Sequence, residues 1–311
     1  MIDSRIVHNG TGVSGREFAL DVRRSVISHN DTGFFLTRMT AVIRRSRIND
    51  NTSFGVVGTY SVRLAMFRSR VNRNGVGVNV AGVYNVERSR LMRNGVGLDV
   101  VDGSLIWLTD SVVGSSETAA VQVTNGQATI RQSLIIDTDG QAIQNDVGIV
   151  EVVNSTITGT SSGTAATIGN NSGVVQIVSS TVHDNNGDQG FISNGPSGVV
   201  LVGSSILTHV GPTACVGVTR STGWNLVSTQ GCPGFGIASG DSSLAALSDA
   251  GLQPLADNGG LTMTFAISDE STALDRLVPP FVCDVAVDQR GVSRPQGAGC
   301  DAGAYERSVS K

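Results

Sequence analysis

The stretch Ser69-Arg-Val-Asn-Arg-Asn-Gly-Val-Gly-Val-Asn-Val80 returns 20 residues later as Ser89-Arg-Leu-Met-Arg-Asn-Gly-Val-Gly-Leu-Asp-Val100. Two nearly identical segments at this separation indicate a chain built from repeats. In each copy an aliphatic residue stands two places after the serine, and an alternating stretch follows the asparagine. This alternation is typical of short β-strands that bury one face.

The pattern extends from these two copies toward both ends of the chain. Serines open ten repeats at spacings of 20 to 25 residues: Ser4, Ser25, Ser46, Ser69, Ser89, Ser111, Ser133, Ser155, Ser180 and Ser205. Apolar residues recur two positions after these serines, and three and five positions before them. Strand alternation that returns every ~22 residues, with no helical stretch between, predicts an all-β fold. We expect a single-stranded right-handed parallel β-helix, a solenoid with three short strands per coil of about 22 residues.

Asparagine stands five positions after the serine in six copies: Asn9, Asn30, Asn51, Asn74, Asn94 and Asn185. Asparagine tolerates left-handed backbone angles, and stacked amides can hydrogen-bond from coil to coil. We therefore interpret the Ser and Asn columns as structural and not catalytic. We predict regular coils over residues 1–210, and irregular, disulfide-supported coils with a cap over residues 211–311, since the end of a solenoid otherwise exposes an edge.

All four cysteines, Cys215, Cys232, Cys283 and Cys300, lie in the C-terminal part, and the members of each successive pair are 17 residues apart. The absence of a Cys-x-x-Cys unit and the scarcity of nearby histidine argue against a zinc site. Two disulfides that close local loops are favoured, with the 215–232 and 283–300 pairing preferred over the two alternatives. Disulfides imply an oxidising compartment.

The C-terminal part also contains recognisable motifs. They are Leu255-Ala-Asp-Asn-Gly-Gly-Leu-Thr-Met-Thr-Phe-Ala266, Asp288-Gln-Arg-Gly-Val-Ser-Arg-Pro-Gln-Gly297 and Cys300-Asp-Ala-Gly-Ala-Tyr-Glu306. Together they resemble the C-terminal signature of secreted bacterial right-handed β-helix repeat proteins, grouped with choice-of-anchor and polymorphic outer membrane protein-like surface proteins. The resemblance implies export and surface display, and it brings no shared catalytic residues.

Charge is distributed unevenly along the chain. Residues 1–93 contain 15 arginines and six acidic residues, whereas residues 94–311 contain seven cationic and 20 acidic residues. Many of these arginines flank the repeat serines: Arg24, Arg45, Arg68 and Arg88 precede one, and Arg47, Arg70 and Arg90 follow one. Stacking would align them into columns at the strand spacing of ~4.8 Å. Unpaired cations this close repel, which favours an anionic ligand that spans several coils. The alternative is a solvated face balanced by scattered acids.

Many right-handed β-helices of the pectin lyase-like kind are polysaccharide lyases or hydrolases, so catalysis is the alternative function. Glycosidases need two or three carboxylates at fixed separation, and lyases need a base. The outward candidates Asp21, Glu87 and Glu151 belong to well-separated coils, and two acidic pairs, Asp137 with Asp139 and Asp184 with Asp188, flank turns. None of these forms a compact group, so we assign no catalytic residue and leave catalysis open. A second alternative is a metal trio of His8, His29 and Asp50, but we expect neither a metal nor a cofactor.

The sequence therefore predicts a non-catalytic extracellular or cell-surface scaffold, adhesin-like, that binds an acidic polysaccharide or another anionic polymer through the arginine columns. We do not expect nucleic acid as the partner, because aromatic stacking residues are scarce. No apolar run approaches the roughly 18–20 residues needed to span a bilayer. No signal segment precedes the first repeat, so we expect a trimmed or mature form of an exported protein. Upstream coils, or self-association, are further partners expected at the N-terminal end.

Overall fold

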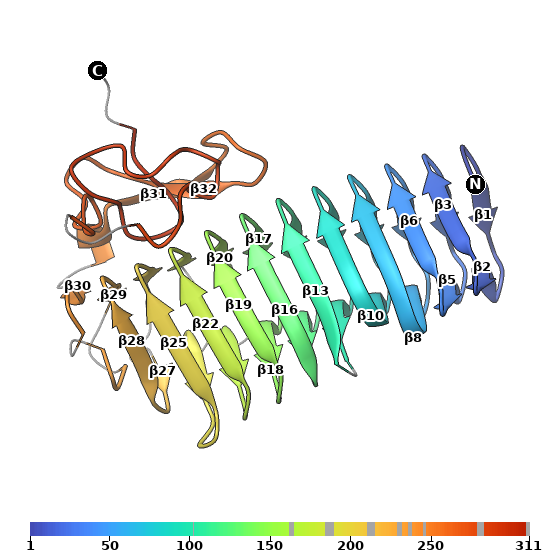
Figure 1. Ribbon diagram of the computed structural model, residues 1–311, viewed down its shortest axis with the longest axis horizontal. Helices are drawn as coiled ribbons and strands as arrows, with labels where there is room; N and C mark the ends of the chain where they lie inside the picture. Colours follow the sequence, from blue (N-terminus) through green and yellow to red (C-terminus); the bar gives the residue numbers. More distant parts are fainter. Residues whose placement is uncertain are drawn as a thin grey trace.

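The computed structural model describes residues 1–311 except 102, 162–164, 184–189, 210–214, 229–231, 236–237, 245–246, 279–282 and 309–311. The described chain winds into a row of stacked coils, and a C-terminal segment lies along the side of the stack (Figure 1). A regular coil contributes one strand to each of three sheets, and every strand pairing between coils is parallel. The predicted parallel β-helix is confirmed.

The three sheets are named in the order in which the chain visits them. The first contains β1 (Arg5–Val7), β4 (Val26–Ser28), β7 (Arg47–Asn49), β9 (Arg70–Asn72), β11 (Arg90–Met92), β14 (Val112–Gly114), β17 (Leu134–Ile136), β20 (Thr156–Thr158), β23 (Thr181–His183), β26 (Ile206–Leu207), β29 (Leu226–Ser228) and β30 (Ser242–Leu244). The second contains β2 (Thr11–Arg16), β5 (Thr32–Thr37), β12 (Val96–Val100), β15 (Ala119–Val123), β18 (Gln141–Asn145), β21 (Ile168–Asn170), β24 (Ile192–Asn194) and β27 (Cys215–Val216). The third contains β3 (Ala19–Arg23), β6 (Thr40–Arg44), β13 (Ser104–Thr109), β16 (Gly126–Arg131), β19 (Ile149–Val153), β22 (Val174–Val178), β25 (Val199–Gly203) and β28 (Thr219–Gly223).

Two long strands, β8 (Phe54–Phe67) and β10 (Val76–Glu87), pass from the second sheet into the third without a break. The first half of β8 pairs with β5 and its second half with β6. Coils are numbered here by their strand in the first sheet, so that coils 1 to 5 open with β1, β4, β7, β9 and β11. The coil pattern extends through β30, beyond the predicted end of the regular repeats at residue 210. Residues 210–214, where we placed the boundary between the two parts, lie outside the described residues.

The core lies inside the coils, where the predicted aliphatic positions of all three strands meet. Ile27, Ile48 and Val71, each two residues after a repeat serine, are fully buried. Val22, Ile43 and Met66, each three residues before a serine, are also fully buried. These columns belong to one continuous apolar cluster along the solenoid. Close stacking also explains part of the glycine content, since a Cβ on Gly55 would lie only 2.5 Å from the carbonyl oxygen of Gly77 in the next coil.

The Ser and Asn columns form the expected ladders. The Asn51 Oδ1 atom accepts from the backbone N and the Nδ2 of Asn30, both at 3.1 Å, and Asn51 Nδ2 donates to Asn74 Oδ1 at 2.8 Å. The Ser25 backbone N donates to Ser46 Oγ at 3.2 Å. Asn185, the sixth predicted ladder member, lies outside the described residues.

One detail of the asparagine prediction is wrong. The left-handed backbone angle falls on the residue before the asparagine, as in His29 (φ 57°) and Asp50 (φ 57°), and not on the asparagine itself. The ladder asparagines Asn30, Asn51, Asn74 and Asn94 have no left-handed angle, and their side chains are buried. The ladder therefore depends on hydrogen bonding alone.

The C-terminal segment begins with a 3-10 helix, η1 (Leu247–Ala250), followed by an antiparallel pair, β31 (Leu252–Ala256) and β32 (Thr264–Ile267). We expected a cap at the end of the solenoid, but residues 252–278 and 283–308 lie along the outer face of the first sheet, beside β17 to β29 (Figure 1). Thr262 Oγ1 donates to the Gln132 carbonyl at 3.1 Å, and the Ala304 N donates to Thr181 Oγ1 at 3.0 Å. The segment thereby bridges several consecutive coils.

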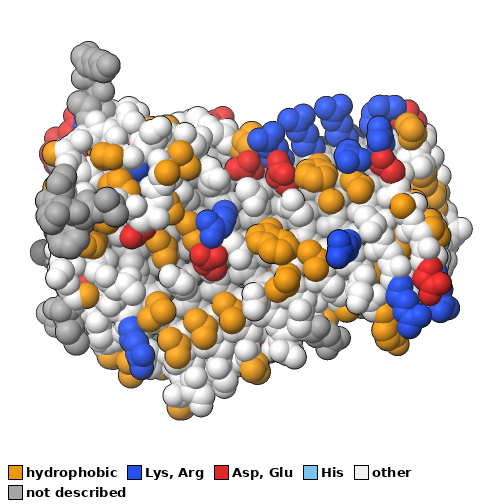
Figure 2. Space-filling model, viewed as in Figure 1, with side chains coloured by type: hydrophobic (Ala, Val, Ile, Leu, Met, Phe, Trp, Pro, Cys, Tyr) orange, Lys and Arg blue, Asp and Glu red, His pale blue; other side chains and the backbone are white. Residues whose placement is uncertain are grey.

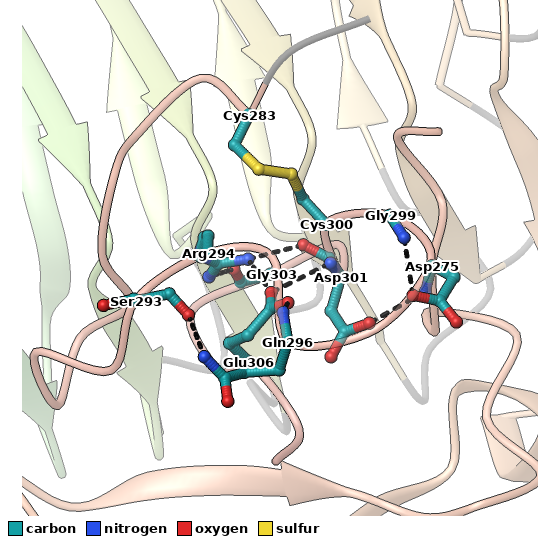
Figure 3. The surroundings of a disulfide bond; sticks show 10 residues. All are labelled: Asp275, Cys283, Ser293, Arg294, Gln296, Gly299, Cys300, Asp301, Gly303 and Glu306. Atoms are coloured by element: carbon teal, nitrogen blue, oxygen red, sulfur yellow. Dashed lines mark hydrogen bonds and ion pairs between the residues drawn. A yellow bond between two sulfur atoms is a disulfide. The ribbon is translucent and has the colours of Figure 1, made fainter. Parts of the chain in front are cut away.

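Disulfides join Cys215 to Cys232 and Cys283 to Cys300, the pairing preferred from the sequence. A buried ionic network adjoins the second disulfide (Figure 3). Arg294 Nη1 lies 3.0 Å from Glu306 Oε2, and both side chains are almost fully buried. Burial raises the pKa of Glu306 and lowers that of Arg294. The carbonyl oxygens of Asp301 and Gly303 also accept from the two terminal nitrogens of the guanidinium, whereas its Nε is buried without a hydrogen-bond partner among the described residues. The buried charge of Arg294 is therefore compensated mainly at its outer edge.

Candidate functional site

The predicted binding residues occupy two neighbouring columns on the corner where the third sheet turns into the first. Arg24, Arg45, Arg68 and Arg88 sit at the corner itself, and each has a left-handed backbone with φ between 48° and 50°. A left-handed angle disfavours residues with a Cβ by roughly 1–2 kcal/mol per residue. The corner position therefore accepts arginine only at a cost in stability.

The arginine at each end of this corner column forms an ion pair with an acidic residue. Asp3 lies 2.6 Å from Arg24, and the hydrogen bond from Arg24 lowers the pKa of Asp3. At the other end, Arg88 lies 3.5 Å from Asp110 and 3.5 Å from its own neighbour Glu87. The two middle arginines, Arg45 and Arg68, form no ion pair with any residue in the described ranges.

The corner column borders a shallow depression of about 310 Å³. Its lining is almost entirely cationic: Arg23, Arg24, Arg44, Arg45, Phe67 and Arg68. Asp21 supplies the compensating charge on one side, at 2.5 Å from Arg23 and 3.2 Å from Arg44, and the hydrogen bond from Arg23 lowers its pKa. Figure 2 shows the basic side chains as a row along the upper edge of the N-terminal half.

The second column consists of Arg47, Arg70 and Arg90, which occupy equivalent positions of β7, β9 and β11 and pair in register. All three point away from the core and are exposed. No ion pair involves them among the described residues. The structure thus brings the seven predicted arginines onto one corner, with the buried Ser column between the two rows.

The second column, which contains Arg47, Arg70 and Arg90, continues with apolar residues where the C-terminal segment covers the sheet. In the next two coils the position of Arg90 is taken by Val112 and Leu134, of which Leu134 is fully buried. The segment approaches Arg90 closely enough that Leu261 and Met263 line one recess together with it. The arginine columns therefore occupy the part of this face that the described C-terminal segment leaves open.

Three of the carboxylates considered as catalytic candidates, Asp21, Glu87 and Glu151, are each paired with an arginine. Asp21 pairs with Arg23 and Arg44, as described above, and Glu151 lies 3.0 Å from Arg131. Asp137 and Asp139 form no described ion pair, and Asp139 Oδ1 accepts from a serine hydroxyl. Asp184 and Asp188 lie outside the described residues.

The predicted alternative of a metal site at His8, His29 and Asp50 meets the same obstacle, because its carboxylate is paired with an arginine. His8 and His29 stack with ring centroids 5.4 Å apart, but Asp50 lies 2.5 Å from Arg73, whose hydrogen bond lowers the Asp50 pKa. Within the described ranges, no group of three His, Cys, Asp or Glu side chains is placed to hold a metal.

Sequence reasoning missed a notch of about 760 Å³ at the corner between the second and third sheets. It is lined by coils 3, 4 and 5: Gly58, Thr59, Tyr60, Ser61, Val62, Arg63, Asn79, Ala81, Gly82, Val83, Val101, Gly103 and Leu105. The lower edge of the molecule is indented at this corner (Figure 2). The available signal was the spacing from Ser69 to Ser89, at 20 residues the shortest between any two repeat serines.

A half-buried carboxylate stands beside this notch. Asn79 Nδ2 donates to Asp99 Oδ2 at 2.6 Å, and Asp99 Oδ1 is buried without a hydrogen-bond partner. Burial raises the pKa of Asp99, although the hydrogen bond from Asn79 opposes this effect. Because Asn79 lines the notch, Asp99 fixes the orientation of one of its polar groups.

Comparison with known proteins supports the fold. A family model described as "Right handed beta helix region" matches residues 1–135. The solved structure titled "Crystal structure of pectate lyase Pel9A" matches with a TM-score of 0.58 at 13% sequence identity, covering 97% of this chain and 88% of that chain. Comparison with curated proteins gives no match. The chain therefore has the right-handed parallel β-helix fold predicted from its repeats. Among the described residues there is no helix with the length and apolar character that crossing a bilayer requires.

Proposed function

We propose that this chain is an exported, non-catalytic β-helix scaffold that binds an acidic polysaccharide through its two arginine columns. The observation that supports this most directly is the pair Arg45 and Arg68. They are adjacent in the stack, exposed, left-handed in backbone conformation and without an acidic partner in the described structure.

The corner itself does not require arginine. In later coils the equivalent left-handed position holds other polar residues: Asp110, Gln132, Asn154, Ser179 and Ser204. The left-handed angle is therefore a property of the corner, and smaller polar residues satisfy it. Arginine at this position in four coils in succession adds charge repulsion, which a role outside folding explains.

The arrangement suits a linear polyanion. Corner residues of adjacent coils lie at the strand spacing of ~4.8 Å, so a chain laid along the solenoid axis would meet one guanidinium per coil. Arginine binds carboxylate and sulfate groups through paired N–H donors. Phe67 is the sole aromatic residue among the six that line the cationic depression, so the stacking platforms that single-stranded nucleic acids use are lacking there.

The test is retention on immobilised heparin and on polygalacturonate over a salt gradient. We expect the variant with Arg45, Arg68 and Arg88 changed to Ala to elute at markedly lower salt than the unmodified chain. A matched control changes three exposed arginines outside the columns, Arg16, Arg131 and Arg220, to Ala. Equal losses in the two variants would show a nonspecific charge effect and overturn the proposal.

Surface display is part of the same proposal. The two disulfides are compatible with an oxidising compartment. The motifs between Leu255 and Glu306 support placing the chain with choice-of-anchor and polymorphic outer membrane protein-like surface proteins. Export to the cell surface would put the arginine columns within reach of extracellular polysaccharides.

A polysaccharide lyase or glycoside hydrolase is the second candidate. The likeness to a pectate lyase favours it, since that protein acts on an acidic polysaccharide and shares the fold. The test is product formation on a panel of polyuronates by the intact chain. Turnover that survives in the variant with Arg45, Arg68 and Arg88 changed to Ala would point to a catalytic site away from the columns.

A further inference from the structure

We infer that the notch at the corner between the second and third sheets is a separate binding site for a single hexuronic acid residue. It lies at the opposite end of the third-sheet strands from the arginine corner, so it is independent of the proposed polymer-binding surface. The inference rests on the shape of the notch, on the chemistry of its walls and on one cation that has no ion pair with the residues the structure describes.

The notch exists because coil 4 turns this corner more tightly than its neighbours. Its strand β10 runs straight through Ala81 and Gly82, and Gly82 adopts φ 152° so close to coil 3 that a Cβ would lie 2.0 Å from the Val62 carbonyl oxygen. Coils 3 and 5 thus stand on either side of a lower coil 4. Their backbones are about 9.6 Å apart, twice the strand spacing. A gap of this width accepts one sugar ring between side chains of the two walls.

The walls and floor match the two faces of a sugar ring. Tyr60 of coil 3 lines the notch and is 67% exposed. The Arg38 guanidinium lies 5.4 Å from the centre of its ring. Because Arg38 belongs to coil 2, we infer that the opposite face of the ring is the one that stacks on the C–H groups of the sugar. Ala81 and Val83 supply an apolar floor.

Polar groups surround this apolar centre. Thr59 and Ser61 offer hydroxyl groups, and Asn79 offers an amide that Asp99 holds in place at 2.6 Å. Tyr60 and Ser61 both have left-handed backbones, with φ 56° and 62°. Two consecutive residues in this strained conformation are typical of sites where function fixes the backbone.

Arg63 determines the preference for an acid. It lines the notch, is exposed and forms no ion pair within the described part of the chain. Its neighbours in register are Thr40 and Val83, neither of which can neutralise it. A carboxylate at the edge of the ring would satisfy its paired N–H donors. Neutral hexoses would keep the stacking contact but lose this interaction.

The experiment is ligand-observed NMR titration of the intact chain with galacturonic and glucuronic acid, using galactose and glucose as neutral counterparts. We expect each acid to bind at least about tenfold more tightly than its neutral counterpart, the range of one charge-assisted hydrogen bond. Arg63→Gln should abolish this difference, and Ala81→Phe should block the notch and abolish binding of both kinds of sugar. The variant with Arg45 and Arg68 changed to Ala should bind the monosaccharides as the unmodified chain does.

Three results would overturn the inference. They are the absence of uronate binding to the intact chain, a preference for the acid that persists in Arg63→Gln, and loss of binding in the variant of Arg45 and Arg68. The last result would assign the monosaccharides to the arginine columns. Failure of polymer retention with intact monosaccharide binding would instead count only against the proposed function, so the two proposals can fail separately.

Discussion

Replacing Arg45 and Arg68 together by Asn should increase stability and weaken polyanion binding at the same time. Asparagine tolerates the left-handed conformation that both positions adopt, with φ of 49° and 48°. Relief of the backbone strain is expected to contribute about 0.5–1 kcal/mol at each position.

Loss of charge repulsion adds to this gain. Two guanidinium groups about 5–7 Å apart in water repel by about 0.6–0.8 kcal/mol, and salt reduces this value. The double variant should therefore be more stable by about 1–3 kcal/mol in total. Urea unfolding followed by tryptophan fluorescence measures the change as a higher midpoint at an unchanged slope. Elution from heparin should meanwhile move to lower salt.

The neighbouring strand column provides the matched control. Arg47 and Arg70 have the same charge and exposure, but they lie in extended strands. Changing both to Asn removes equal charge without relieving a left-handed angle, and asparagine is a poor strand residue. The control should weaken binding without increasing stability beyond the small electrostatic gain. If the Arg45 and Arg68 variant is less stable than the unmodified chain, the argument from backbone strain is refuted.

Three further predictions concern stability. Asn51→Ala should lower the free energy of unfolding by about 3 kcal/mol, because it leaves buried ladder partners unpaired. Asn9→Ala, at the exposed end of the ladder, should lower it by less than about 1 kcal/mol. Equal losses in urea unfolding would contradict a stabilising role of the ladder. Glu306→Gln should lower the free energy of unfolding by about 3–5 kcal/mol, because it leaves the buried charge of Arg294 uncompensated. Hydrogen exchange should show this as early loss of protection in the C-terminal segment. Protection that persists would show that the ion pair is dispensable. Asp99→Asn should raise the melting temperature at pH 7 but not near pH 3. Burial raises the pKa of Asp99 in the folded state, so the stability that the protonated carboxyl contributes is lost as the pH rises through that pKa. An equal effect at both pH values would exclude titration of Asp99 as the cause.

The repeat made most of the fold predictable. A periodic chain places equivalent residues next to each other, so one pattern of buried positions describes every coil. The inward columns that contain Ile48, Val71 and Met66 are buried as expected, and the amide ladder forms between Asn51 and Asn74. Equal spacing within the two cysteine pairs likewise indicated the disulfides that the structure contains.

The rest depended on interactions between parts of the chain that do not repeat. The position of the C-terminal segment was not predicted, although the change from Arg90 to Val112 and Leu134 at one outward position marks where cover begins. Ion pairs between coils, such as Arg73 with Asp50, depend on side-chain reach that the pattern does not specify. The notch arises because coil 4 makes a shorter turn at this corner than its neighbours, and no short sequence motif marks such a turn.

The lateral attachment of the C-terminal segment has a mechanical consequence. A bare solenoid is held together only between adjacent coils, so it can fray one coil at a time. Thr262 donates to the Gln132 carbonyl and the Ala304 N to Thr181, whereas Asn154 donates to the Val287 carbonyl and Thr156 to Gln289. These hydrogen bonds tie four successive coils, coils 6 to 9, to the C-terminal segment. Under tension applied to the two ends, the first five coils should therefore peel away in small steps, while the strapped half resists and yields in one larger event.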